Sequence, residues 1–149
     1  MIQGKWYAPG DAALPAVTVR EAVFGAGRDT TDDISWNTVV FLDGEPAAAG
    51  RIWWADGDFV LGSVGVLSDK RGQRLGDLVL RLLLFKAKGH AASRVVLDCP
   101  AETAGFFERL GFRVTASSEG TAHMEAAGNE IELDTCKSCK KKDCPNRQE

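Results

Sequence analysis

Residues 64–76 read V-G-V-L-S-D-K-R-G-Q-R-L-G. An apolar run comes first, a charged turn containing Gly72 follows it, and the stretch ends at Gly76. The apolar run is typical of a β-strand, and residues 77–83 continue as an amphipathic helix. Glycines at a strand-to-helix turn let backbone N–H groups approach a ligand, and a helix N-terminus carries partial positive charge. The turn is therefore a candidate anion-binding site. Its spacing matches neither the Walker P-loop nor the complete G-x-G-x-x-G dinucleotide fingerprint.

This turn resembles the pyrophosphate-binding turn of GNAT acyltransferases, which follows the pattern R/Q-x-x-G-x-G/A after a strand. Arg71 takes the first position and Gly76 the last, while Arg74 stands where the inner glycine is usual. A second segment, residues 101–112, reads A-E-T-A-G-F-F-E-R-L-G-F and resembles the family's A-x-x-F-Y-x-K-x-G-F. The resemblance covers residues 15–127 and implies the GNAT-like acyl-CoA N-acyltransferase fold, an α/β (α+β) architecture with a mixed sheet.

Hydrophobic periodicity and turn residues predict an element order that agrees with this fold. Predicted strands cover residues 5–8, 36–42, 47–54, 59–67, 94–98, 112–116, 121–126 and 130–133, and predicted helices cover 17–24, 74–91 and 102–110. Residues 17–24 also suit a strand by propensity, and the resemblance favours the helix. The order strand, helix, strand over residues 59–98 implies parallel pairing of its two strands.

The long helix has apolar residues at helical spacing. We expect its core-facing positions to be Leu75, Leu78, Val79, Leu82 and Phe85. In the shorter helix, Gly111 suits the left-handed position just past a helix end.

Composition predicts one globular domain, because apolar residues make up 44% and charged residues 26% of 149 positions. We expect an acyltransferase domain over residues 1–127 and a tail over 128–149. Residues 136–149 carry a net charge of +3, whereas the whole chain carries −3. This balance argues against a nucleic-acid or membrane partner. The N-terminus lacks a signal-peptide core, and the most apolar run, residues 75–85, is too short to span a bilayer. We expect a cytoplasmic location with reduced cysteines.

The resemblance implies acetyl-CoA as co-substrate, held between the strands 59–67 and 94–98. The implied contacts are Val64 and Val66 on the strand, and Arg71, Gly72, Gln73, Arg74, Leu75 and Gly76 in the turn. The implied reaction is attack of a neutral primary amine, on a small molecule or a peptide, at the acetyl thioester. An acidic stretch at residues 29–33 either attracts a cationic amine or is a solvated loop.

The family's usual acid is a tyrosine, and Phe107 occupies that position here. Cys99 or Ser63 could replace it, although a structural role explains each residue better. Asp58 or Asp98 could act as the base, again with a structural alternative.

Other chemistry-bearing residues have plainer interpretations. Tyr7, the single tyrosine, lies in a distant segment, and His90 and His123 suit surface or packing positions. The four tryptophans could line an acceptor pocket or the face of a homodimer, and core packing explains most of them better.

Three cysteines of the tail, Cys136, Cys139 and Cys144, follow the spacing C-x₂-C-x₄-C. A C-x₂-C pair can present two thiolates to one zinc ion or iron–sulfur cluster, with Cys99 or His123 as a fourth ligand. A redox-sensitive or partner-binding tail, and a tail without a role, are the alternatives. The main prediction is an N-acetyltransferase. Its rivals are a non-catalytic acyl-CoA-binding module and a metal or redox sensor.

Overall fold

The computed structural model describes residues 1–131, and the three tail cysteines lie outside this range. Seven strands form one sheet in the order β1-β2-β3-β4-β5-β7-β6. The strands are β1 (Ile2–Tyr7), β2 (Ser35–Leu42), β3 (Glu45–Ala55), β4 (Asp58–Val66), β5 (Arg94–Pro100), β6 (Arg113–Ser118) and β7 (Thr121–Ala127). The helices are α1 (Leu14–Phe24), α2 (Leu75–Gly89) and α3 (Ala104–Glu108). The expected mixed α/β fold is confirmed.

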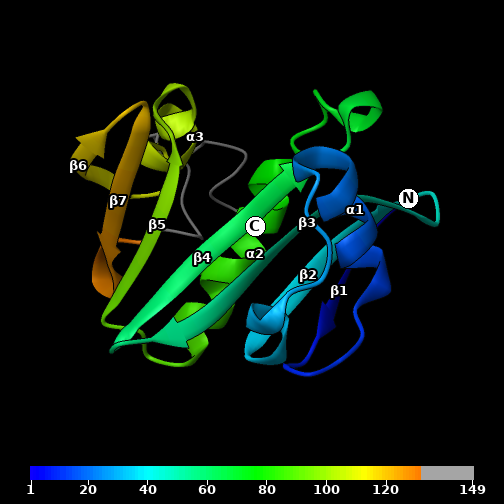
Figure 1. The fold of residues 1–149 in the computed structure, drawn as a ribbon, viewed down its shortest axis with the longest axis horizontal. Coiled ribbons are helices and arrows are strands. Elements are labelled where there is room, and N and C mark those ends of the chain that lie inside the picture. The colour runs from blue at the N-terminus through cyan, green and yellow to red at the C-terminus, as the bar shows by residue number, and fades with distance from the viewer. Residues whose placement is uncertain (132–149) are drawn as a thin grey trace, which may run out of the picture.

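All neighbouring strands pair antiparallel except β4 and β5, which run parallel as expected. Helices α1 and α2 lie on opposite faces of the first four strands (Figure 1). Because strand side chains alternate between faces, Val39 packs in the cluster under α1 and Val40 in the larger core under α2. The four antiparallel strands are thereby fixed from both sides.

Helix α2 confirms the expected core positions in part, because Leu75 and Val79 are buried and Leu78 and Leu82 pack against the core, whereas Phe85 does not. Its buried residues are Leu75, Val79, Leu80, Leu83, Leu84 and Ala87, whereas Leu78 and Leu82 are half-buried and Phe85 is 67% exposed. The helix is apolar around most of its circumference, so periodicity alone leaves its rotation open. Packing against the sheet fixes the rotation.

Residues 17–24 belong to helix α1, which confirms the helix over the strand that propensity also allowed. Pro15 stands in the first helical turn, where its missing N–H is no loss, and Gly25 ends the helix with φ of 69°. Gly111 likewise has the positive φ expected of it, 108°. No helix within residues 1–131 has the length and hydropathy needed to cross a membrane.

The final predicted strand, residues 130–133, is wrong at its start. Gly128–Glu130 form a short 3₁₀-helix instead, and residues 132–133 lie outside the described range. Lys88 at the end of α2 donates hydrogen bonds to the carbonyls of Gly128 and Ile131, which ties this segment to the helix rather than to the sheet.

Candidate active site

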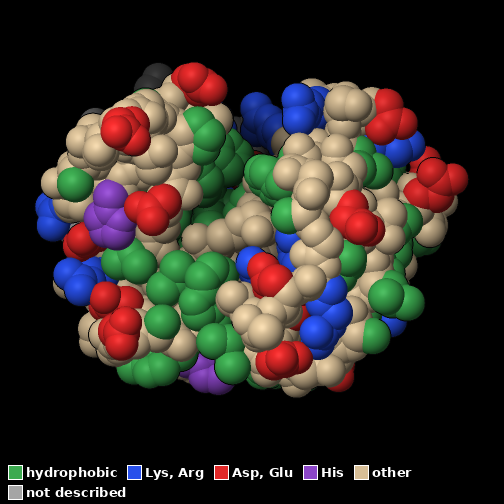
Figure 2. Space-filling view, in the orientation of Figure 1, with side chains coloured by type: hydrophobic (Ala, Val, Ile, Leu, Met, Phe, Trp, Pro, Cys, Tyr) green, Lys and Arg blue, Asp and Glu red, His purple; other side chains and the backbone are tan. Residues whose placement is uncertain are grey.

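Strands β4 and β5 separate after a short parallel contact. Their paired residues are Phe59 with Val95 and Val60 with Val96. Beyond these pairs a cavity of about 500 Å³ opens between the strands, and apolar side chains gather in the hollow that Figure 2 shows between two halves of the molecule. The cavity is lined by Val23, Phe24, Leu61, Gly62, Ser63, Val64, Gly65, Val66, Arg71, Gly76, Leu97, Asp98, Cys99, Pro100, Glu102, Thr103, Phe106 and Phe107.

A β-bulge in β4 shapes one wall of the cavity. The register with β3 shifts between Ala49 and Arg51, where β4 carries one extra residue. Ser63 lies in this bulge with φ of 55°, in the left-handed region that residues with a side chain rarely adopt. A bulge interrupts the regular ladder and redirects side chains. The predicted site residue Ser63 therefore lines the cavity.

The glycine turn closes one end of the cavity. Arg71 lines it and donates a hydrogen bond from Nε to the carbonyl of Val66 at 3.3 Å. Gly72 has φ of 87°, and Arg74, the N-cap of α2, has φ of 60°. The missing family glycine thus falls on a left-handed position, where an arginine costs about 1–2 kcal/mol more than a glycine. Arg74 therefore adopts the left-handed backbone conformation that a glycine adopts more easily.

Gly76 lies where β4, α2 and α3 meet. A Cβ at this position would lie 3.3 Å from Val66 Cγ2 and 3.4 Å from Phe106 Cζ. These contacts are tight enough that any side chain must displace its neighbours. Glycine therefore keeps the first turn of α2 close to the cavity wall.

Residues 13–112 match the Acetyltransferase (GNAT) family. The chain is also 33% identical, over 111 residues, to glucosamine 6-phosphate N-acetyltransferase 1 of Oryza sativa subsp. japonica, with 66% of this chain and 67% of that protein covered. The chain belongs to the GNAT acetyltransferase family. The enzyme class expected from the sequence, acyl group transfer, is confirmed.

Solved structures share the fold at low identity. An acyl-CoA N-acyltransferase from Pseudomonas aeruginosa has a TM-score of 0.73 and 20% identity, over 85% of this chain and 100% of that one. A GNAT family acetyltransferase from Elizabethkingia anophelis with acetyl-CoA bound has a TM-score of 0.67 and 12% identity, over 85% and 97%. The GNAT family uses acetyl-CoA.

At the position where the GNAT acid is usually a tyrosine, Phe107 lines the cavity and is otherwise buried. Its ring packs edge to face against Phe106 at 5.0 Å and Phe112 at 6.1 Å between centroids. Cys99 also lines the cavity, and its Sγ lies 3.8 Å from the Sδ of Met124. The structure therefore brings Cys99, Ser63 and Phe107 to one cavity.

The two carboxylates proposed as bases have different surroundings. Asp98 lines the cavity. Asp58 does not, and both its oxygens accept hydrogen bonds from Arg94, at 2.9 and 2.7 Å. The hydrogen bond from Arg94 lowers the pKa of Asp58 below its ordinary value. A carboxylate committed to an arginine outside the cavity is poorly placed to accept a substrate proton.

His123, which the sequence suggested only as a surface, packing or metal-binding residue, contacts the cavity residue Asp98. Its Nδ1 lies 2.7 Å from Asp98 Oδ1 and its Nε2 lies 3.2 Å from Glu125 Oε2. The hydrogen bond with Asp98 chiefly raises the pKa of His123, with Glu125 adding to it against the opposing effect of burial. Asp98 and His123 stand opposite each other on β5 and β7, 25 residues apart in sequence. The sequence signal is cross-strand register, which no local motif reveals.

The acidic loop at residues 29–33 does not present free carboxylates to a substrate. Asp29 binds Arg51, Asp32 binds Arg20, and Asp33 binds Arg28. The tryptophans also lie outside the cavity lining. Trp6 and Trp36 pack against the main core and hold Lys86 Nζ at 4.7 and 4.0 Å from their ring centroids.

No group of three or more potential metal ligands occurs among residues 1–131. Cys136, Cys139 and Cys144 lie beyond that range, so the zinc or iron–sulfur site stays a prediction. The residues suggested as a fourth ligand have other partners, because Cys99 contacts Met124 and His123 contacts two carboxylates.

Proposed function

We propose that this chain transfers an acetyl group from acetyl-CoA to a primary amine in the cavity between β4 and β5. One observation carries the proposal. The parallel contact ends at Val60 and Val96, and the cavity that opens beyond it reaches the Arg71 turn. A thioester in this space would have strand backbone on one side and the start of α2 at one end.

The pantetheine arm and the phosphates of acetyl-CoA both have suitable partners in this arrangement. The edge of β4 that faces β5 loses its strand partner after Val60, so N–H and C=O groups near Val64 and Val66 can bind a pantetheine arm. The phosphates would meet the N–H groups of residues 72–76 at the N-terminus of α2. Leu75 is buried, so we assign its backbone rather than its side chain to this contact. Arg71, Gln73 and Arg74 supply the polar side chains of the turn.

The proposed transfer is a direct attack of the acceptor amine on the acetyl thioester. Once neutral, the amine attacks the thioester carbonyl carbon, so that a C–N bond forms and the C–S bond breaks, and the proton that the nitrogen then loses passes through solvent to the departed CoA thiolate. Backbone N–H groups near Val66 would stabilise the oxyanion. A cysteine-like thiol has a pKa of about 8.5, so the sulfur can leave as a thiolate without the acid that Phe107 cannot provide. We expect a slow enzyme, since general acid catalysis contributes roughly 10²–10⁴-fold.

The acceptor follows from the family only as an amine. The rice relative is named for glucosamine 6-phosphate. For this chain we propose the primary amine of a small molecule or of a peptide.

Release of free CoA with a panel of amines tests the proposed function. The matched variants are Phe107→Tyr, which restores a phenol in the cavity wall, and Phe112→Tyr, which adds the same group in the same aromatic cluster outside the lining. We expect Phe107→Tyr alone to raise kcat, by about tenfold or more. Binding of acetyl-CoA without release of CoA with any amine would instead make the chain an acyl-CoA-binding module.

A second pair of variants tests the turn. Arg71→Gln removes a cation from the cavity wall, and Lys70→Gln removes one from the adjacent residue outside the lining. We expect Arg71→Gln to raise the KM for acetyl-CoA about tenfold, because a charge-assisted hydrogen bond to phosphate is lost. Equal KM values in the two variants would contradict the proposed position of the phosphates.

A further inference from the structure

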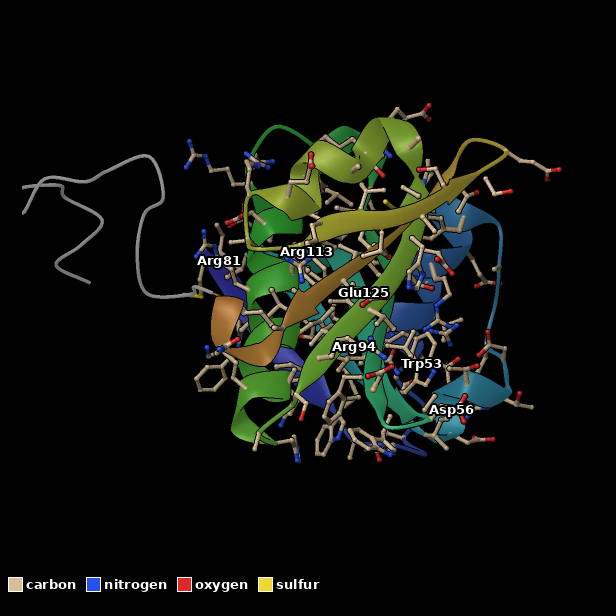
Figure 3. All side chains as sticks on the ribbon, turned by 90° about the vertical axis from the view of Figure 1, so that its left-hand side faces the viewer. Trp53, Asp56, Arg81, Arg94, Arg113 and Glu125 are labelled. Carbon is tan, nitrogen blue, oxygen red and sulfur yellow. The ribbon has the colours of Figure 1, made fainter. Side chains whose placement is uncertain are left out.

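Five charged side chains form a continuous chain across three strands. Asp58 on β4 binds Arg94 on β5, Arg94 binds Glu125 on β7, Glu125 contacts His123, and His123 contacts Asp98 on β5. The separations are between 2.7 and 3.2 Å, and Figure 3 shows Arg94 and Glu125 beside each other. The charges alternate in sign along the chain when His123 is protonated. Each group is therefore oriented by the next.

The chain ends at the cavity. Asp98 is its one member in the cavity lining. Its side chain is 69% exposed, while His123 is 36% and Glu125 26% exposed. In Figure 2 histidine and acidic side chains gather beside the hollow, on the side of β5 and β7. The Asp98 carboxylate is therefore open to solvent, and the His123 imidazole contacts one of its oxygens.

Fold stability gives little reason for this arrangement. Ion pairs at such exposure contribute little to folding, because water screens the charges and the side chains lose rotamer freedom. The core of this half of the sheet is apolar and is supplied by Leu97, Met124 and Ala126. The contact with His123 gives the Asp98 carboxylate a defined orientation at the cavity.

We propose that Asp98 binds the ammonium group of a cationic acceptor at the cavity mouth, and that His123 is the positioning residue that holds Asp98 for this contact. The inference rests on the proposed acetyl transfer and names the class of its acceptor.

The charges of the cavity lining favour a cation over a phosphorylated amine. Its charged residues are Arg71, Asp98 and Glu102. Arg71 lies in the turn that the proposed function assigns to the phosphates of acetyl-CoA, which leaves two carboxylates for the acceptor. A phosphate group on the acceptor would meet like charge here and lose affinity. The acceptor is thus an amine that carries a further cationic group besides the attacking nitrogen, unlike the phosphorylated amino sugar that names the rice relative.

Steady-state acetylation of three probes tests this assignment: 1,5-diaminopentane, glucosamine and glucosamine 6-phosphate. We expect kcat/KM to fall in that order for the unmodified chain. In Asp98→Asn the KM for 1,5-diaminopentane should rise about tenfold, as expected for loss of one charge-assisted hydrogen bond. The thermal shift with acetyl-CoA should not change, because Asp98 lies outside the turn.

Asp43→Asn is the matched control, since it removes one carboxylate at an exposed turn outside the cavity lining. Asp43 has φ of 52°, a conformation that asparagine tolerates. We expect this control to leave every KM unchanged.

His123→Gln separates positioning from folding. It keeps a side chain of similar size and removes the imidazole that contacts Asp98, so we expect a KM increase of about threefold for the diamine with kcat unchanged. In Asp98→Asn, the further substitution His123→Gln should have no additional effect on KM.

Three results would overturn the inference. They are glucosamine 6-phosphate as the best probe, an unchanged diamine KM in Asp98→Asn, and no acetylation of either cationic probe by a chain that acetyl-CoA stabilises. Absence of any stabilisation by acetyl-CoA would instead refute the proposed function itself, and with it this inference.

Discussion

Two networks of charged side chains lie on opposite halves of the sheet, and they differ chiefly in burial. Near α1, Arg20 and Asp32 are 4% and 2% exposed and meet through two hydrogen bonds of 2.8 and 2.9 Å. On β5 and β7, Asp98 and His123 form an equally short contact at 69% and 36% exposure. Similar distances therefore occur in very different surroundings.

The difference indicates what each network does. Buried ion pairs that lose one partner leave an uncompensated charge, so they become indispensable once built. Arg20 also donates to Asn37 Oδ1 and to the carbonyl of Gly27, which satisfies the guanidinium inside the fold. The exposed network lacks that constraint and ends at a cavity. We infer that the buried network holds the loop after α1 in place and that the exposed network contributes to ligand binding.

Asp32→Asn should show the largest effect. It leaves Arg20 buried with a neutral partner, and we expect the free energy of unfolding to fall by about 3 kcal/mol. Asp33→Asn is the control, because Asp33 is exposed and pairs with the exposed Arg28; its effect should stay within about 0.5 kcal/mol. Urea denaturation of both variants measures the difference, and equal losses would remove the distinction between the networks.

Acid should weaken the buried network specifically. Burial alone would raise the pKa of Asp32, but hydrogen bonds from Arg20 and the Asp29 N–H outweigh it and hold that pKa well below its ordinary value. A depressed carboxyl pKa stabilises the folded state above the unfolded pKa, about 3.9, and the contribution is lost as pH falls toward the folded pKa. Urea denaturation between neutral pH and pH near 3 should therefore show a smaller loss in Asp32→Asn. Parallel pH profiles would contradict this account.

Arg94→Gln should have a modest effect on stability although it breaks contacts with both Asp58 and Glu125. Arg94 is half exposed, and we expect the free energy of unfolding to fall by less than about 1 kcal/mol. A loss comparable to that of Asp32→Asn would mean that the exposed network is structural as well. Thermal unfolding in the same buffer gives the comparison directly.

The smallest effect on stability is expected from the titration of His123. The groups that face it are Asp98 on β5 and Glu125 on its own strand, with Arg94 and Arg113 beside Glu125. Because the pKa of His123 is raised, its stabilising contribution is full below the unfolded pKa, about 6.5, and is lost as pH rises through the folded pKa. Nuclear magnetic resonance of the imidazole should show the pKa falling in Asp98→Asn. An unchanged pKa would show that the contact does not persist in solution.

The fold could be predicted because the sequence signals that define its elements each lie within a short stretch of the chain. The glycine turn, the Asp-Gly hairpin at Asp43 and the β-branched strand of residues 94–98 each fix short-range geometry. The core-facing side of α2 was predictable only in part: Leu75 and Val79 are buried as expected, whereas Phe85 is exposed and its neighbour Leu84 is buried, in a helix that is apolar on most sides.

The candidate site was only partly predictable for the same reason. The turn from Arg71 to Gly76 is contiguous, so a pattern can describe it. The contact between Asp98 and His123 depends on the register of β5 with β7, and the neutralised acidic loop depends on arginines from α1 and β3. Long-range pairings of this kind appear only once the strands are assembled.

Thermal unfolding of the reduced protein with and without acetyl-CoA tests the central claim most directly. A ligand present at about a thousand times its dissociation constant stabilises the folded state by roughly 4 kcal/mol, which corresponds to a rise in Tm on the order of 10 °C for a domain of this size. We predict a clear rise that is reduced in Arg71→Gln and retained in Lys70→Gln. No rise at millimolar acetyl-CoA would contradict a cofactor site between β4 and β5.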